Sequence, residues 1–370
     1  MITKKNDFEN LDQARIEKIA DKIGADNKIR RNLVYRSHVW FSLIFLRHHF
    51  DYRFAPFQKE MFQLSEDTTH KIIAIMAFRC SGKSTIISLS YVLWAILGKQ
   101  QKKCVIIISK NQQQVKTLLT NIRYELESNH LLSRDLGPFK VNEQEKWGVL
   151  SIELPLMNAC IIAISRGQSI RGIKHGSHRP DLIVIDDIED SKSVDLNERN
   201  FVYEWFQNEV LTIGDQNTKI MIVGNLVRAD SFMMKIMNNI EDNKINGIFK
   251  AYPLLDNHNR VLWPERFPSP EDIKNLQKQF TEYVWNKDYL LRLRVFQHDL
   301  RDCDKEMIAK YLPESEMSCP CKRSEPTTSL MAKYCISVPI VNDFPQLKAR
   351  RRMFEMAKER RKMLSKQDIK

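Results

Sequence analysis

The residues best suited to chemistry in this sequence are a lysine and a serine within the segment AFRCSGKST. This segment follows the apolar run IIAIM and precedes the helical pattern IISLSYVLWAIL, so a strand, a loop and a helix are expected in that order. In such a loop Gly82 lets the backbone approach phosphates, Lys83 reaches the β and γ phosphates, and the Ser84 hydroxyl binds Mg²⁺. Ala77 stands where the common pattern has its first glycine. The spacing predicts an ATP-binding loop made of Arg79, Cys80, Ser81, Gly82, Lys83, Ser84 and Thr85.

A pair of acids in LIVIDDIED supplies the second half of such a site. Four apolar residues precede Asp186 and Asp187, which is the arrangement of carboxylates at the end of a buried strand. We expect Asp186 to hold Mg²⁺ and Asp187 to act as the general base on the attacking water. Because Asp187 is short for that task, Glu189 is an alternative base. Helix capping is the competing role for an acidic pair after a strand.

Two other segments carry candidate nucleotide contacts. Phe57 and Gln58, in FAPFQKEMF, could pack against adenine and hydrogen-bond to its edge, although an ordinary helix start accounts for them equally well. Asn225 ends the apolar run KIMIVGN, where its side chain could contact the γ phosphate and report hydrolysis.

Short apolar runs alternate with longer helical patterns from Ile72 onward. The runs IIAIMAF, CVIIIS, CIIAIS, LIVIDD and KIMIVGN are rich in Ile and Val, which is typical of strands buried on both faces of a parallel sheet. The fold class expected is α/β, a RecA-like P-loop core whose mainly parallel sheet is flanked by helices. The expected divisions are a helical lead-in (1–51), the ATPase domain (52–268), a helical linker that includes Glu271 to Phe296 (269–312) and a C-terminal region with a basic helix (313–370).

The bulk composition favours a polyanionic partner and a reducing environment. The net charge of +12 points to nucleic acid, and a merely basic surface is the alternative. The seven cysteines show no regular spacing, so neither a disulfide framework nor a zinc site is expected. Apolar segments such as Val39 to Leu46 are too short to span a bilayer, so we expect no membrane partner.

The order of these motifs resembles one family, the large terminase subunit of tailed bacteriophages and prophages, which packages DNA into proheads. The resemblance runs from about Ser37 to Phe296. It includes FQKEM, the R-x-x-G-K-S form of the loop with Arg79 in the family's arginine position, IVGNLVRADS and LWPERF. The phrase SIRG ahead of RPDLIVIDD is its most specific part, since generic P-loop ATPases lack it.

The resemblance implies an ATPase that drives double-stranded DNA into proheads in the host bacterial cytoplasm. It implies a homo-oligomeric ring at a portal protein, and a small terminase subunit as a further partner. It also implies that Arg171, or as second choice Arg166, acts on the nucleotide of the neighbouring subunit. Binding of DNA phosphates is the other use of either arginine.

The family's second half is a two-metal nuclease with an RNase H-like fold, so the resemblance implies that residues 313–370 are a degenerate or truncated remnant of it. The acids of such a nuclease are not recognisable here. No apolar strand ending in an acid follows IAKYLPE, so we expect no nuclease activity. This loss keeps open an inactive prophage remnant that only binds nucleotide or DNA. A helicase-like remodelling ATPase is the other alternative, although the chain is short for two RecA domains.

Overall fold

A seven-stranded sheet forms the centre of the protein. The computed structural model describes residues 26–142, 147–189, 196–296 and 335–339. The strand order is β3-β4-β2-β5-β6-β1-β7, and every neighbouring pair is parallel except β3 with β4. The strands are β1 (Ile72–Ala77), β2 (Cys104–Ser109), β3 (Ser151–Leu154), β4 (Ala159–Ser165), β5 (Leu182–Asp186), β6 (Lys219–Gly224) and β7 (Gly247–Tyr252).

The composition of the strands explains which of them the sequence reveals. Every residue of β1, β2, β5 and β6 is buried, as a strand covered on both faces requires. All five expected strands and the mainly parallel α/β sheet are therefore confirmed. The two edge strands were not predicted: β3 has four residues with alternating burial, and most of β7 is half-buried.

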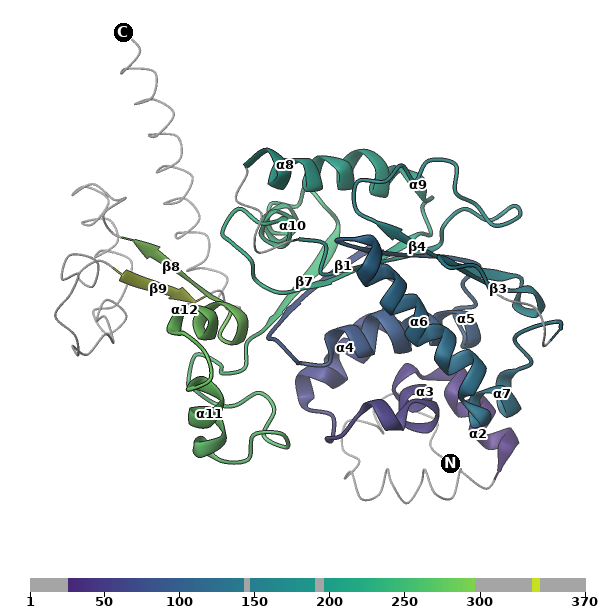
Figure 1. Ribbon diagram of the computed structural model, residues 1–370, viewed down its shortest axis with the longest axis horizontal. Helices are drawn as coiled ribbons and strands as arrows, with labels where there is room; N and C mark the ends of the chain where they lie inside the picture. The colour runs from purple at the N-terminus through teal and green to yellow at the C-terminus, as the bar shows by residue number, and fades with distance from the viewer. Residues whose placement is uncertain (1–25, 143–146, 190–195, 297–334, 340–370) are drawn as a thin grey trace, which may run out of the picture.

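Helices cover both faces of the sheet (Figure 1), and each face has its own buried apolar cluster. On one face lie α8 (Leu196–Trp205), η5 (Phe206–Val210), α9 (Leu211–Ile213) and α10 (Phe232–Glu241). The other face carries α2 (Asn27–Arg36), α3 (His38–Phe45), η2 (Arg47–His49), α4 (Pro56–Glu66), η3 (Thr85–Tyr91), α5 (Val92–Leu97), α6 (Gln112–Ser128) and α7 (His130–Leu136). The short η4 (Pro155–Met157) joins β3 to β4.

The helices before the first strand pack into the same core as the sheet. Asp26 caps α2 by accepting hydrogen bonds from the amides of Lys28 and Ile29. Phe41 and Phe45 of α3 belong to the buried cluster that also contains Ile73 of β1. This part of the expected lead-in therefore contributes apolar surface to the core of the sheet.

The segment after β7 begins with helices and ends in a strand. It contains α11 (Pro270–Gln277), α12 (Glu282–Val284), η6 (Trp285–Tyr289) and β8 (Arg292–Phe296), which pairs with β9 (Cys335–Pro339). The expectation of a helix as far as Phe296 is wrong, because Leu291 has a φ of 52° and the alternating RLRVF continues as a strand. The expectations for residues 1–25, and for 313–370 apart from β9, lie outside the described residues. Among the helices that the structure describes, none is long and apolar enough to cross a bilayer.

Candidate active site

The predicted phosphate-binding loop connects β1 to the π-helical segment η3. Cys80 and Gly82 have φ values of 61° and 86°, and such left-handed residues let consecutive backbone amides form an anion-binding concavity. A Cβ at position 82 would lie 3.1 Å from Nε2 of Gln58, so glycine is needed here for space as well as for conformation. Ala77 remains the last, fully buried residue of β1. The chain turns after it, so a Cβ at that position is accommodated.

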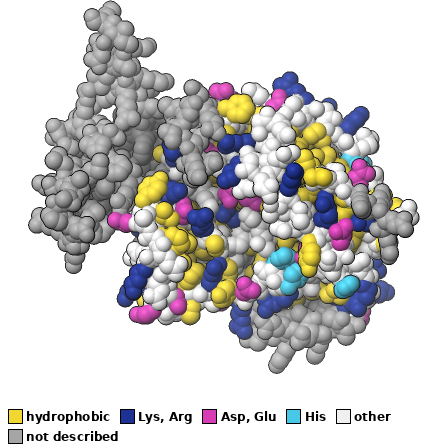
Figure 2. All heavy atoms as spheres, in the orientation of Figure 1, with side chains coloured by type: hydrophobic (Ala, Val, Ile, Leu, Met, Phe, Trp, Pro, Cys, Tyr) yellow, Lys and Arg dark blue, Asp and Glu magenta, His cyan; other side chains and the backbone are white. Residues whose placement is uncertain are grey.

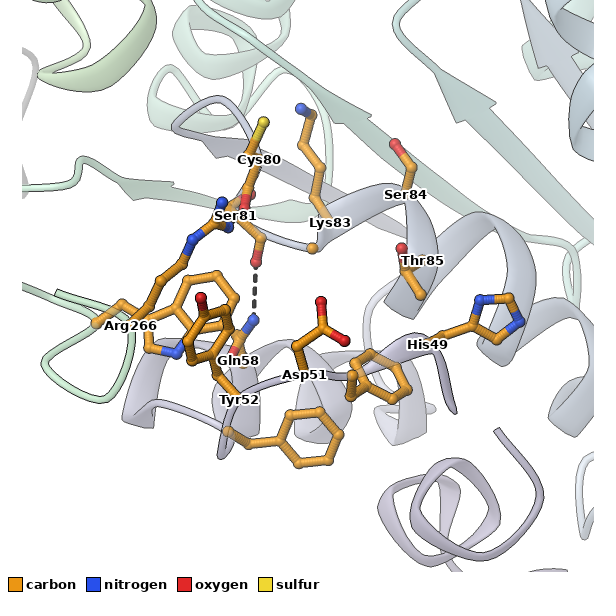
Figure 3. Close-up of a pocket in the computed structure, with 14 residues that line it drawn as sticks. His49, Asp51, Tyr52, Gln58, Cys80, Ser81, Lys83, Ser84, Thr85 and Arg266 are labelled. Carbon is orange, nitrogen blue, oxygen red and sulfur yellow. Dashed lines mark hydrogen bonds between the residues drawn. The ribbon is translucent and has the colours of Figure 1, made fainter. Parts of the chain in front are cut away.

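Gln58 holds this loop through a buried hydrogen bond. Its Nε2 donates a hydrogen bond of 2.8 Å to the carbonyl oxygen of Ser81, and its Oε1 accepts one of 3.0 Å from the amide of Ala55 (Figure 3). The side chain is 1% exposed. Both ends of the amide are thus committed to the protein, one to the loop and one to the start of α4.

Phe57 lies in the core and does not line the pocket over the loop. Its ring packs against the rings of Phe78, Tyr252 and Trp263 at centroid distances of 5.6, 5.6 and 6.0 Å. The contacts of this ring in the structure are therefore with other aromatic side chains of the core, and its contact with adenine stays a prediction.

Asp186 accepts hydrogen bonds from two serine hydroxyls, one in the loop and one in η3. Ser84 Oγ donates to its Oδ1 at 3.1 Å, and Ser88 Oγ donates to its Oδ2 at 2.6 Å. Burial and the neighbouring charge of Asp187 raise the pKa of Asp186 to about 6, while Ser88, Lys83 and Ser84 partly offset this rise. The negative charge of the Asp186 carboxylate is therefore only partly compensated by the groups around it.

The strand order explains why Asp187 faces the loop lysine. β6 lies between β1 and β5, so the carboxyl ends of all three strands meet at one edge. Lys83 Nζ lies 3.9 Å from Asp187 Oδ2; the lysine side chain is 7% exposed and that of the aspartate 37%. Asp187 has a φ of 45°, and its amide donates to the carbonyl of Val223 on β6. The acid is therefore fixed just beyond β5, at the open side of the site.

The oxygen atoms of Ser84 and Asp186 suit Mg²⁺. Hydroxyl and carboxylate oxygens are the ligands this ion prefers, and it usually takes only one or two protein ligands besides phosphate oxygens and water. The raised pKa of Asp186 has its cause in burial without a full counter-charge, which a divalent cation would supply. The residues present therefore fit the expected ion.

The remaining predicted residues lie around this centre. Asn225 follows β6, and its Oδ1 is buried without a hydrogen-bond partner among the described residues. Glu189 accepts a 2.6 Å hydrogen bond from the amide of Phe232 at the start of α10. Burial raises the pKa of Glu189, and the amides of Phe232 and Met233 lower it in part. Glu189 therefore acts as a helix cap in this arrangement.

Arg171 and Arg166, the two arginines expected to act on the nucleotide of a neighbouring subunit, do not line the pocket. Arg171 Nε lies 2.8 Å from Glu209 Oε1, and its side chain is 71% exposed. Arg166 Nη1 donates to the carbonyl of Ile188, the residue that follows Asp187, at 3.3 Å. The structure thus brings Arg166 near the acid segment and leaves Arg171 at the surface.

A pocket of about 390 Å³ opens over the loop, and part of its lining was not predicted (Figure 3). Arg266 Nη1 donates to the carbonyl of Cys80 at 2.7 Å. Its guanidinium carbon lies 5.1 Å from the centre of the Trp263 ring and 5.7 Å from that of Tyr52. The sequence signal was LWPERF, which contains Trp263 and Arg266, but nothing in it placed them beside the loop. Arg79, the predicted loop cation, instead pairs with Asp288 at 3.4 Å.

The sequence and the structure were compared with known proteins, and similar solved structures were found. No protein-family model and no curated protein matches the sequence. The structure is similar to the large terminase of bacteriophage HK97 (TM-score 0.46, 14% identity, covering 69% of this chain and 54% of that chain). It is also similar to the large terminase of a thermophilic bacteriophage in complex with ADP (0.43, 12%, 64% and 53%) and to the large terminase ATPase domain of a Thermus phage (0.41, 12%, 67% and 96%). The chain spans about half the length of the first two proteins.

Proposed function

We propose that the protein is an ATPase whose centre is made by the loop after β1 and the acids after β5. The observation that supports this most directly is the convergence of Lys83, Ser84 and the two acids. Ser84 donates to Asp186, and Lys83 lies within 3.9 Å of Asp187. Helix capping, the competing role for the acids, does not account for a buried lysine near Asp187 together with a serine hydroxyl that donates to the buried Asp186.

Each residue has a defined part in this proposal. Lys83 contacts the β and γ phosphate oxygens, and Asp187 accepts the proton of the attacking water at its carboxylate. Mg²⁺, held by Ser84 and Asp186, would neutralise charge on the phosphates. The unpaired Oδ1 of Asn225 is available to accept a hydrogen bond from the attacking water or from a neighbouring donor when the γ phosphate leaves.

The base of the nucleotide has a matching surface. Tyr52 and Arg266 line the side of the pocket away from Ser84 and Thr85 (Figure 3). Trp263 also lines the pocket, and its ring lies against the Arg266 guanidinium. Aromatic rings and a guanidinium plane stack well on a purine, and Arg266 also holds the loop through Cys80. We propose that adenine lies on this surface and not against Phe57.

Replacing Lys83 by Ala tests the assignment. Loss of the charge that meets the phosphates should lower ATP turnover by at least about 100-fold, as removal of one transition-state donor does. The matched control is Lys99→Ala, because Lys99 pairs with Glu66 at the surface and does not line the pocket. Equal turnover in the two variants, both with the unfolding midpoint of the original protein, would disprove the site.

We further propose that hydrolysis drives movement of double-stranded DNA during phage packaging, in a ring of identical subunits. The supports are the resemblance in sequence, the likeness in fold to terminases and the net charge of +12. Lys and Arg side chains are spread over one face of the described surface (Figure 2). A portal protein and a small terminase subunit are the partners proposed.

Arg171 is proposed to act on the nucleotide of the neighbouring subunit. Its side chain is 71% exposed, whereas that of its partner Glu209 is 16% exposed, so the arginine lies on the solvent side of the pair and can exchange Glu209 for a phosphate. An arginine supplied in this way contributes about 10³ to 10⁵ in rate in related enzymes.

DNA binding separates this motor from an ATPase of another kind. Affinity for double-stranded DNA should be independent of sequence and should fall steeply as salt rises, since the basic residues act through phosphates. It is measured by fluorescence anisotropy at several salt concentrations. Absence of binding at low salt would leave the ATPase proposal standing and remove the DNA motor.

A further inference from the structure

A second cluster of ligand-type side chains lies where η2 meets α6. His48 and His49 come from η2, and Glu125 comes from the last two turns of α6. Nε2 of each histidine lies 2.9 Å from the same carboxylate oxygen, Oε1 of Glu125. All three ligand atoms lie within 4.8 Å of one another. Among the described residues, this is where histidine and carboxylate groups converge closely enough to share an ion.

The geometry is close to that of a tetrahedral metal site. Bonds of about 2.0–2.2 Å from Zn²⁺ to nitrogen and oxygen place neighbouring ligand atoms roughly 3.3–3.5 Å apart. The two nitrogen–oxygen distances must therefore widen by about half an ångström. Because the side chains of His48 and His49 are 53% and 30% exposed, rotation of the rings can provide this change without disturbing the core.

The Glu125 carboxylate is held in place by Asn129, which is not one of the three candidate ligands. Oε2 of Glu125 accepts a 2.8 Å hydrogen bond from Nδ2 of Asn129, which also donates to the carbonyl of Phe45. The Glu125 side chain is only 1% exposed. Hydrogen bonds of this kind behind a ligand orient it and raise metal affinity about 10- to 100-fold in known sites. Glu125 thus has a fixed direction, with both imidazoles on its open side.

We propose that His48, His49 and Glu125 bind one divalent transition-metal ion, Zn²⁺ being the best fit. Two imidazoles and one carboxylate are the protein ligands of many three-ligand zinc sites, and imidazole favours such metals over Mg²⁺. Each imidazole binds through the lone pair on Nε2, with its hydrogen on Nδ1. The exposed side leaves a fourth position for water.

The ion would join two parts of the fold that otherwise meet through hydrogen bonds. His49 of η2 itself lines the pocket over the loop, and so do Phe50, Asp51 and Tyr52, which follow it (Figure 3). Fixing η2 to α6 therefore stiffens one wall of that pocket. This consequence depends on the proposed nucleotide site, whereas binding of the ion itself does not.

Titration with Co²⁺ and Zn²⁺ alone, on the full chain without a histidine tag, tests the proposal. Co²⁺ should give visible absorption bands from a four- or five-coordinate site, and Zn²⁺ should displace it at one equivalent. In the double variant His48→Ala, His49→Ala this equivalent should bind more than about tenfold more weakly. The matched control, His258→Ala, removes an exposed histidine elsewhere and should leave binding unchanged.

Thiols and carboxylates elsewhere in the chain can also take up added metal ions, so only the difference between variants decides. Equal stoichiometry and affinity in the original protein and the double variant would overturn the proposal, as would absence of micromolar binding in the original protein. Should the double variant unfold, His48→Ala alone gives the same decision, because this side chain is half exposed. Loss of ATP turnover has no bearing on this result.

Discussion

The two sides of the pocket are built in different ways. On the proposed phosphate side, Lys83 and Ser84 come from one continuous segment and meet the two acids at the end of β5, two strands away in the sheet. On the base side, Tyr52 and Arg266 come from loops far apart in the sequence and meet through a ring–guanidinium contact. Chemistry at the phosphate side thus depends on fixed polar contacts, whereas the base side depends on stacking that tolerates movement. Substitutions on the two sides should differ accordingly in what they change.

Asp187→Asn should have the largest effect on this comparison. Loss of the general base should lower kcat for ATP by about 10² to 10⁴ while the KM changes little. Steady-state kinetics at saturating Mg²⁺ give both values. Glu189→Gln is the matched control, because an amide oxygen still caps α10. A larger loss in the Glu189 variant than in the Asp187 variant would reverse their roles.

Arg266→Ala should show the opposite pattern. Removing the guanidinium stack costs about 0.5–2 kcal/mol of binding, so the KM for ATP should rise about two- to thirtyfold with little change in kcat. Arg260→Ala is the control, since Arg260 pairs with Asp256 at the surface of the same connection. A fall in kcat with an unchanged KM would show that Arg266 acts on the phosphates, and the contrast between the two sides would disappear.

Gln58→Ala should have the smallest effect on turnover, because its contacts are to the protein and not to the pocket's contents. It should instead lower the free energy of unfolding by about 1–3 kcal/mol, since the Ala55 amide and the Ser81 carbonyl lose a buried partner. Chemical denaturation measures this, with Gln63→Ala, an exposed position of α4, as the control. A large rise in KM without loss of stability would return Gln58 to the role of adenine contact.

The sequence predicts the convergence of Lys83, Ser84 and the two acids because its determinants are local. A loop between a buried strand and a helix can be recognised from about fifteen residues, and the two acids directly follow an apolar run with the length and composition of a buried strand. The sequence does not predict the proposed base side, because no local pattern indicates that Trp263 lies beside Arg53. In the structure, Trp263 Nε1 donates a hydrogen bond to the Arg53 carbonyl. Phe57 shows the same limit in reverse, since an aromatic residue near a predicted site is more often part of the core.

The fold was predictable where strands are buried on both faces. β1, β2, β5 and β6 are continuous apolar runs, but β7 carries a lysine, Lys250, that pairs with Glu60 at 2.7 Å. A mixed sequence of this kind resembles a loop when read alone. β8 was not predicted for another reason: its residues alternate as in a strand only after Leu291, where the positive φ ends the helix.

The hydrogen bond between Glu189 and the first turn of α10 links two strand ends to one helix. β6 reaches α10 through the chain that begins at Asn225, and β5 reaches it through this carboxylate. α10 is therefore attached to the ends of both strands. When the two strand ends shift together, α10 can move with them, but a relative displacement of Asp187 and Asn225 strains the hydrogen bond between Glu189 and the Phe232 amide. The helix is thus sensitive to the separation of Asp187 and Asn225, the two residues to which we assign the proposed general base and the proposed contact with the attacking water.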